Sequence, residues 1–203
     1  MGMNDSLAAE KAALRRSIRA AWPGQARRDA ESAALCAHLT TWAPFRQAAV
    51  VGGYMPMARE ADVTLLLRRV LEDGRTLALP RCGPAPEMGF HQVTALERLA
   101  PGRWGVPEPP EDAPFVPPEA LALVLVPLEG VDKAGGRLGK GGGYYDRLLG
   151  RTRALRVGVA LSWQEVARVP CAPWDAPLDA LADARGVRLF SRKCCDGLNE
   201  LDL

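Results

Sequence analysis

The run Leu121-Ala122-Leu123-Val124-Leu125-Val126 is apolar at every position and is the strongest strand signal in the chain. Apolar residues on both faces of a strand are typical of a buried sheet whose neighbouring strands are parallel. The run leads through Pro127 into a segment with seven glycines between Gly130 and Gly143. A buried strand that opens into a glycine-rich loop predicts an α/β fold with a ligand site beyond the carboxyl ends of its strands.

The remaining sequence predicts helices that alternate with strands. Helical spacing of apolar residues predicts helices over residues 7–21, 29–39, 63–71 and 143–149, the third capped by Asp62 or Thr64. Apolar runs predict strands over residues 48–55, 76–79, 88–93, 120–126, 155–161 and 187–190. Seven prolines between Pro101 and Pro118 indicate a long ordered loop. We therefore expect one α/β domain over residues 1–190 with a largely parallel sheet, followed by a mobile tail over 191–203.

Composition narrows the class of protein. The 203 residues are 48% hydrophobic and 25% charged, which is typical of a globular chain, and no apolar stretch is long enough to cross a membrane. A formal net charge of +2 gives no general reason to expect a nucleic-acid or membrane partner. The five cysteines include no CxxC pair, which indicates reduced thiols in a cytoplasmic protein. The two histidines match no zinc pattern and argue against a Ser-His-Asp triad.

The glycine-rich loop has the parts of a phosphate-binding segment. Glycine lets backbone N–H groups approach an anion closely, and the helix that follows directs its positive end toward the same place. Arg137 and Lys140 add two cations. The spacing is not that of a Walker A loop, and Tyr144 stands where a dinucleotide fingerprint needs its third glycine. A flexible surface loop is the alternative, and the buried strand and the two cations argue against it.

Acidic and basic residues elsewhere suit the same chemistry. Asp146 follows the loop and is placed to hold Mg²⁺, or else is a first-turn acid of the next helix. Asp175, between Pro173 and Pro177, is a second candidate ligand, although taken alone it resembles a turn residue. Lys11 and Arg15 lie four residues apart on one helical face, either to bind an anion or as a solvated basic face.

The segment from Arg137 to Asp146 resembles the signature of the 5-formyltetrahydrofolate cyclo-ligase family, also called methenyltetrahydrofolate synthetase. Further matches fall in family order over about residues 11–185, at residues 11–15, 54–63, 79–81, 88–90 and 104–109, and at Asp175 and Asp179. The resemblance implies a three-layer α/β/α domain. It also implies ATP- and Mg²⁺-dependent cyclisation of 5-formyltetrahydrofolate to 5,10-methenyltetrahydrofolate, with release of ADP and phosphate. From the thiols and the charge balance we expect a cytoplasmic protein without nucleic-acid or membrane partners, and we expect it to be a monomer.

The resemblance also assigns site residues. It implies ATP binding by Lys11, Arg15, Arg137, Leu138, Gly139, Lys140, Gly141, Gly142, Gly143, Tyr144 and Tyr145. Among these, it implies catalytic roles for Lys11, Arg15, Arg137, Lys140 and Tyr145. It implies folate binding by Met55, Glu60, Trp104, Lys140, Gly141, Gly142, Gly143 and Tyr144, and Mg²⁺ binding by Asp146 and Asp175.

Two segments depart from the family pattern, and they keep other functions open. Residues 128–131 and 180–183 differ from the usual residues, and Trp163 and Trp174 replace smaller or more polar ones, which puts the shape of the folate pocket in question. One alternative is an ATP-dependent kinase or ligase that acts on a non-folate substrate. Another is a non-catalytic nucleotide- or folate-binding relative, whose mark would be the loss of Lys11, Arg15 or Asp146; all three are present.

Overall fold

The computed structural model describes residues 3–83 and 87–191, which build an eight-stranded sheet in the order β12-β11-β10-β7-β1-β2-β3-β6. The central strands run parallel to one another: β11 (Ala180–Asp183), β10 (Leu155–Val159), β7 (Leu123–Val126), β1 (Val50–Gly52) and β2 (Thr76–Cys82). On one side β12 (Gly186–Leu189) pairs antiparallel with β11. On the other side β3 (Met88–Val93) pairs antiparallel with β2, and β6 (Phe115–Val116) pairs antiparallel with β3. The predicted largely parallel sheet is confirmed.

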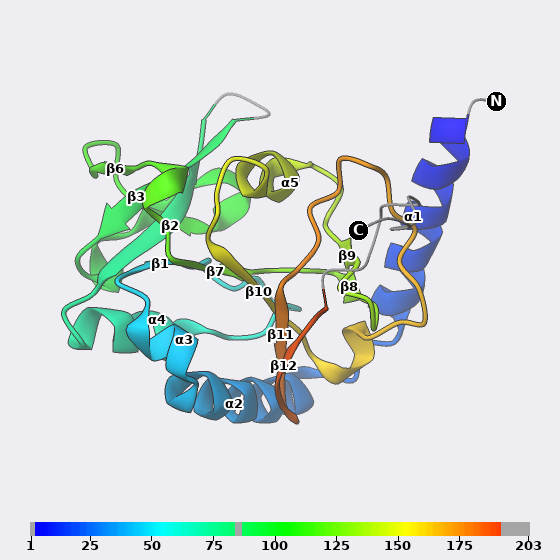
Figure 1. Ribbon diagram of the computed structural model, residues 1–203, viewed down its shortest axis with the longest axis horizontal. Coiled ribbons are helices and arrows are strands. Elements are labelled where there is room, and N and C mark those ends of the chain that lie inside the picture. Colours follow the sequence, from blue (N-terminus) through cyan, green and yellow to red (C-terminus); the bar gives the residue numbers. More distant parts are fainter. Residues whose placement is uncertain (1–2, 84–86, 192–203) are drawn as a thin grey trace, which may run out of the picture.

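Helices cover both faces of the sheet, which gives three layers (Figure 1). Helices α2 (Gln25–Thr41), α3 (Ala43–Gln47) and α4 (Thr64–Glu72) pack on one face, and α5 (Tyr144–Leu149) packs on the other. Strand β7 shows why both faces are needed. Leu123 and Leu125 belong to the core on the first face, and Val124 and Val126 to the core on the second. Because its side chains alternate between two cores, this strand is apolar throughout.

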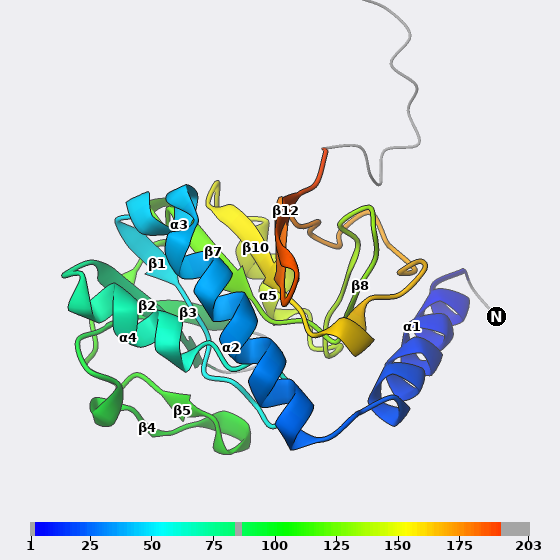
Figure 2. The ribbon, with the colours of Figure 1, turned by 90° about the horizontal axis from the view of Figure 1, so that it is seen from below.

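Helix α1 (Met3–Ala20) lies to one side of the three layers, next to the small hairpin of β8 (Gly130–Val131) and β9 (Arg137–Leu138) (Figure 2). Ile18 is its anchor and packs in a separate cluster with Leu138 and Val169. A Cβ at Gly130 would lie 2.7 Å from the Cδ1 of Ile18, so the end of this side chain packs directly against the hairpin backbone. The N-terminal helix is therefore held against the segment that carries the glycine-rich loop.

Several predicted boundaries were wrong, for local reasons. The strand predicted over 48–55 is limited to Val50–Gly52, because the chain turns away before Pro56. The strand predicted from Ala120 begins at Leu123, after a 3₁₀ turn over Pro118–Ala120. The helix predicted over 29–39 already begins at Gln25. As predicted, Asp62 accepts a hydrogen bond from the N–H of Thr64 (3.0 Å) at the start of α4.

The proline-rich segment is ordered, as predicted, and has short elements of its own. It contains the two-stranded pair of β4 (Ala100–Pro101) and β5 (Pro107–Glu108), and it supplies edge strand β6. Strand β11 and helix α3 were not predicted. Residues 192–203 of the predicted tail lie outside the described residues. In the part of the chain that is described, no helix is both long and apolar enough to cross a bilayer.

Candidate active site

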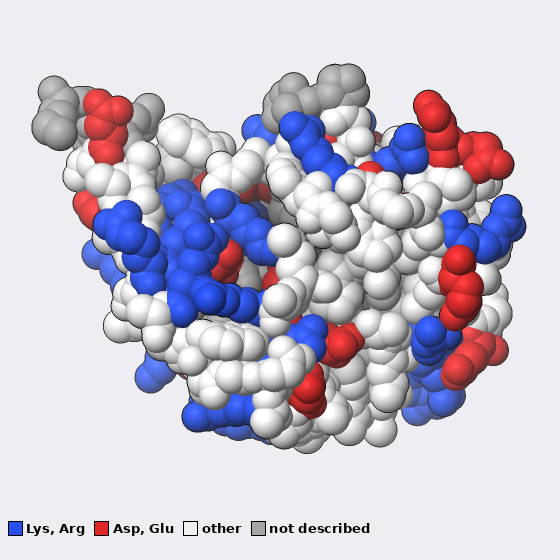
Figure 3. All heavy atoms as spheres, turned by 180° about the vertical axis from the view of Figure 1, so that it is seen from behind, with Lys and Arg blue, Asp and Glu red and all other residues white. Residues whose placement is uncertain are grey.

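The loops that follow β1, β7 and β10 lie at one edge of the sheet, because the carboxyl ends of parallel strands point the same way. These loops are residues 53–63, 127–143 and 160–179. Lys and Arg side chains gather around a hollow on the face opposite that of Figure 1, and acidic side chains are visible within it (Figure 3). The candidate site is thus built from opposite charges at the edge that the fold predicts.

Helix α1 presents three cations on one face toward this edge. Lys11 forms an ion pair with Asp175, Arg15 donates from Nε to the carbonyl of Gly139 (2.7 Å), and Arg19 pairs with Glu129 (2.7 Å). The predicted four-residue spacing therefore directs Lys11 and Arg15 toward the site, whereas the side chain of Arg19 stays 45% exposed. Burial lowers the pKa of Arg15, against the opposing charge of Glu129. A partly desolvated guanidinium beside the glycine-rich loop favours an anionic ligand.

The glycine-rich loop is held open by its backbone conformation and by one buried acid. Gly141 and Gly143 have φ values of +104° and +65°, which residues with a Cβ adopt only under strain. Asp132 is buried and accepts hydrogen bonds from the N–H groups of Ala134, Gly136 and Val169, each at 2.9 Å. This role of Asp132 was not predicted from the sequence, although an Asp shortly before two glycines is a known turn signal.

Of the two predicted metal ligands, Asp146 lies in the first turn of α5 and Asp175 in the loop after β10, and each is paired with a predicted phosphate-binding cation. Asp146 pairs with the buried Arg137 and accepts a hydrogen bond from the N–H of Ala176 (3.3 Å). Asp175 pairs with Lys11 and accepts a hydrogen bond from the N–H of Ala172 (2.7 Å). Two carboxylates suit Mg²⁺, which takes one or two from protein and fills its shell with phosphate oxygens and water. No cluster of three or more His, Cys, Asp or Glu ligands occurs within the described ranges.

Lys140 connects the loop to the residues predicted to bind folate. Its Nζ lies 2.7 Å from Oε1 of Glu60 and 2.6 Å from the sulfur of Met57. The other oxygen of Glu60 accepts a hydrogen bond from the N–H of Met57 (2.8 Å), and buried Arg28 donates to the Glu60 carbonyl (2.7 Å). The contacts of Met57 with the Glu60 carboxylate and of Arg28 with the Glu60 carbonyl were not predicted, because only the folded loop brings these residues together.

Two buried polar atoms at the site have no hydrogen-bond partner within the described part of the chain: the hydroxyl of Tyr145 and Nε of Arg137. A buried polar atom without a partner is costly, so these two atoms are suited to bond a ligand. Burial raises the pKa of Tyr145 well above its usual value, and the charge of Glu60 raises it further while Arg137 opposes the shift. The phenol is therefore a neutral hydrogen-bond donor at physiological pH.

The remaining residues that were predicted to contact a ligand differ in how far their side chains are exposed to solvent. Trp104 is 63% exposed, and its ring meets that of Tyr144 edge-on at a centroid distance of 5.7 Å. Met55 is half-buried and packs against the first core. Leu138 is 1% exposed and packs with Ile18, so its side chain is a core residue and only its backbone can meet a ligand.

Comparison with known proteins gives one consistent answer. The model of the 5-formyltetrahydrofolate cyclo-ligase family matches residues 7–182. The 5-formyltetrahydrofolate cyclo-ligase of Escherichia coli K12 is 30% identical over 174 residues, which cover 83% of this chain and 94% of that protein. The solution structure of Aquifex aeolicus 5,10-methenyltetrahydrofolate synthetase is 33% identical, has a TM-score of 0.78, and the match covers 94% of this chain and 97% of that one.

A more distant structure agrees on the fold. The 5,10-methenyltetrahydrofolate synthetase from Mycoplasma pneumoniae is 21% identical, with a TM-score of 0.70 and coverage of 86% of this chain and 99% of that one. The family match spans the α1 cations, the glycine-rich loop and both candidate metal ligands. This chain therefore belongs to the 5-formyltetrahydrofolate cyclo-ligase family.

Proposed function

We propose that this cyclo-ligase uses Mg²⁺ and ATP to convert 5-formyltetrahydrofolate to 5,10-methenyltetrahydrofolate, with release of ADP and phosphate. The observation that carries the proposal is the 2.7 Å contact between Lys140, on the phosphate-binding loop, and buried Glu60. A loop that reaches both an anion site and a buried carboxylate suits an enzyme that joins a nucleotide to a pterin.

In this proposal, charged side chains and backbone N–H groups bind the ATP. The glycine-rich loop wraps the triphosphate, and Lys11, Arg15, Arg137 and Lys140 spread the negative charge of the transferring phosphoryl group. Asp146 and Asp175 hold Mg²⁺, which neutralises and orients the phosphate oxygens when it is bound. In this scheme Lys11 and Arg137 exchange their carboxylate partners for phosphate oxygens.

The folate is bound by hydrogen bonds and by apolar side chains that fit its shape. The carboxylate of Glu60 accepts hydrogen bonds from the amino and ring N–H groups of the pterin, a pairing that a buried carboxylate makes well. Met55 and Trp104 provide apolar contact surface. Tyr145, whose hydroxyl is buried and unpartnered in the described structure, donates to the formyl oxygen.

The reaction then needs positioning more than acid–base chemistry. The formyl oxygen attacks the terminal phosphorus and displaces ADP. The folate nitrogen at position 10 then attacks the activated carbon, and phosphate leaves with the former formyl oxygen and takes up the proton of that nitrogen. Neither histidine is placed to help, since His38 lies 3.3 Å from the carbonyl of Ala184 and His91 lies 2.8 Å from that of Ala113. Phosphoryl transfer of this kind relies mostly on electrostatic stabilisation.

The proposal places the enzyme in the cytoplasm as a monomer that acts on a small-molecule folate. The free thiols of Cys36 and Cys82 support a reducing compartment. The pKa of Cys36 is raised to about 12, mainly by burial and further by Asp62, so this thiol resists oxidation.

An absorbance assay for methenyltetrahydrofolate tests the function directly. With ATP, Mg²⁺ and 5-formyltetrahydrofolate, product and ADP should form in equal amounts, and leaving out any one of the three should stop both. ATP consumption that needs a different acceptor would favour the kinase or ligase alternative. Binding of ATP and folate without turnover would favour a non-catalytic relative.

A further inference from the structure

The exposed tryptophan of the site has a strained backbone conformation. The turn that carries it contacts a buried acid that is not among the residues assigned to ligand binding. Trp104 has φ of +57°, and it is the one non-glycine residue with positive φ among residues 3–83 and 87–191. A bulky residue in this region is uncommon and costs free energy, so the surrounding structure must enforce it. Trp104 sits in a 3₁₀ turn over Arg103–Gly105, at the tip of the hairpin of β4 and β5.

Glu108 contacts this turn, which is also closed by a backbone hydrogen bond from the N–H of Gly102 to the carbonyl of Val106 (2.9 Å). It is 8% exposed, and its carboxylate reaches back into the hairpin from β5. Oε1 accepts a hydrogen bond from the N–H of Arg103 (3.2 Å), and Oε2 accepts one from the N–H of Cys82 (3.2 Å), the last residue of β2. One side chain thus ties the turn before Trp104 to the central sheet. The charge of Glu108 also raises the pKa of Cys82 to about 11, after the larger effect of burial.

The neighbouring glycine shows how closely this carboxylate is packed. A Cβ on Gly102 would lie 2.4 Å from Cδ and Cγ of Glu108, which is closer than atoms approach. The hairpin therefore needs glycine at this position in order to admit the acid. Arg103 then covers the indole ring of Trp104 at 4.9 Å, and the other contact of that ring is with Tyr144, directly before Tyr145 and Asp146.

We propose that Glu108 is a positioning residue for the folate: it touches no substrate, but it fixes the turn that presents Trp104 to the folate and to Tyr144. This inference rests on the proposed function, since it assigns the Trp104 ring to the folate. It separates Glu108 from Glu60, whose carboxylate meets the pterin itself. It also gives a physical reason for the proline-rich hairpin, which carries one aromatic side chain out to the glycine-rich loop.

The variant Glu108→Ala tests the role, with Glu111→Ala as the matched control. Glu111 is an acid on the same proline-rich segment whose side chain is 94% exposed. Glu108→Ala should raise the KM for 5-formyltetrahydrofolate roughly ten-fold, while kcat and the KM for ATP change by less than about two-fold. Glu108→Gln, which keeps one acceptor oxygen, should fall between the variant and wild type. Glu111→Ala should match wild type.

A double-mutant cycle identifies the route of the effect. In a Trp104→Ala background, Glu108→Ala should cause no further rise in the KM for folate, because the ring it positions is gone. An equal rise in both backgrounds, or an equal change in the KM for ATP, would overturn the positioning role while leaving the cyclo-ligase activity intact.

Hydrogen exchange of the ligand-free protein tests the hold of Glu108 on the turn independently of the substrate of the enzyme. The amides of Cys82 and Arg103 should exchange faster in Glu108→Ala than in Glu111→Ala, because their acceptor has been removed. Unchanged exchange at both amides would overturn the inference whatever the enzyme's substrate. Absence of methenyltetrahydrofolate formation by wild type, together with faster exchange, would instead reject the proposed function and keep Glu108 as the acid that fixes Trp104.

Discussion

At the scale of single residues, the site consists of opposite charges that already satisfy one another. Three ion pairs join a predicted phosphate-binding cation to a predicted metal or folate carboxylate: Lys11–Asp175, Arg137–Asp146 and Lys140–Glu60. A buried charge without a partner is strongly destabilising, so these pairs keep the ligand-free site folded. Ligand binding then replaces one partner with another instead of desolvating bare charges.

Asp146→Asn tests the metal role. The amide keeps the shape of the side chain but loses the charge that Mg²⁺ prefers, so kcat at limiting Mg²⁺ should fall at least about ten-fold. High Mg²⁺ should recover part of the loss. Titration of activity against Mg²⁺ measures it, with Asp112→Asn on the exposed proline-rich segment as the control. An unchanged Mg²⁺ dependence would remove Asp146 from the metal site.

Glu60→Gln tests the folate role. An amide can accept from only one side and donates from the other, so it should weaken folate binding by roughly ten-fold or more. ATP binding should be kept or strengthened, because Lys140 no longer has to leave a carboxylate. Calorimetric titration of each ligand separately measures the two affinities. Equal losses for both ligands would show that Glu60 acts by shaping the loop through Lys140 instead of binding the pterin.

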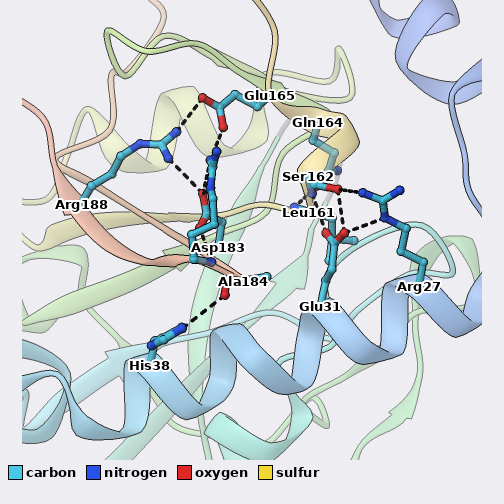
Figure 4. A network of polar contacts seen from close by, with 11 residues as sticks. Arg27, Glu31, His38, Leu161, Ser162, Gln164, Glu165, Asp183, Ala184 and Arg188 are labelled. Carbon is cyan, nitrogen blue, oxygen red and sulfur yellow. Dashed lines mark hydrogen bonds and ion pairs between the residues drawn. The ribbon is translucent and has the colours of Figure 1, made fainter.

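At the scale of elements, a polar cluster fixes the last hairpin of the sheet. Asp183 at the end of β11 and Glu165 in the preceding loop share the guanidinium groups of Arg185 and Arg188 (Figure 4). On the nearby helix α2, Glu31 accepts hydrogen bonds from the N–H and hydroxyl of Ser162 (both 2.7 Å) (Figure 4). These contacts hold the 160–179 loop, which carries Asp175, against the sheet.

Asp183→Asn tests this cluster through the pH dependence of stability. Burial alone would raise the pKa of Asp183, but hydrogen bonds and charge from Arg185 outweigh it and hold the pKa below its usual value. A carboxyl with a lowered folded-state pKa stabilises the fold above its unfolded pKa, near 3.9, and this contribution is lost as the pH falls through the folded pKa. The variant should therefore lose about 1 kcal/mol at neutral pH, a small value because Arg185 is 67% exposed.

Urea unfolding of wild type and Asp183→Asn across pH measures this difference. The gap between the two free energies of unfolding should be full at neutral pH and should close below about pH 4. Glu97→Gln, at an exposed ion pair with Arg68, is the control and should show no measurable change. A gap that stays constant down to acid pH would show that the pair contributes through packing instead of charge.

The elements themselves were largely predictable, because strong periodicity and buried apolar runs dominate them. Strand β7 and helices α1, α4 and α5 follow from local patterns. Strand β11 was missed because Ala180–Asp183 is short and has a charged end, and only its place between β10 and β12 makes it a strand. Helix α3 was missed because Ala43–Gln47 has only five residues and carries Pro44 in its first turn.

The candidate site was predictable as a set of residues but not as a set of contacts. The glycine-rich loop, the α1 cations and the two aspartates are visible in the sequence and meet at one edge of the sheet. The pairing of Lys140 with Glu60 links residues that are 80 positions apart in the chain. The hydrogen bonds that Glu108 accepts from Cys82 and Arg103 depend on the geometry of the hairpin. Contacts of this kind come from tertiary packing, which local patterns do not encode.

At the scale of the whole molecule, the sheet brings the proposed ATP and folate half-sites to one edge, where Lys140 of one contacts Glu60 of the other. Because its ammonium occupies Glu60 in the ligand-free protein, binding of the triphosphate should draw Lys140 away and free the carboxylate for the pterin. ATP and folate should then bind with positive cooperativity, by the same factor in either order.

Lys140→Met tests this coupling. The variant keeps the length of the side chain without its charge, so it should weaken ATP binding and abolish the cooperativity, while the affinity for folate alone rises because Glu60 is free. Calorimetric titration of each ligand in the presence and absence of a non-hydrolysable ATP analogue measures all four affinities. Cooperativity that survives in the variant would show that the halves are coupled by another route.

We expect the loop around Lys140 to direct the terminal phosphate of ATP onto the formyl oxygen of the bound folate. The fate of that oxygen tests it most directly. With 5-formyltetrahydrofolate labelled with oxygen-18 in the formyl group, the released phosphate should carry one label per methenyltetrahydrofolate formed, as mass spectrometry of the phosphate would show. Unlabelled phosphate, with the label released as water, would contradict the account, because ATP would then be cleaved without phosphorylating the folate.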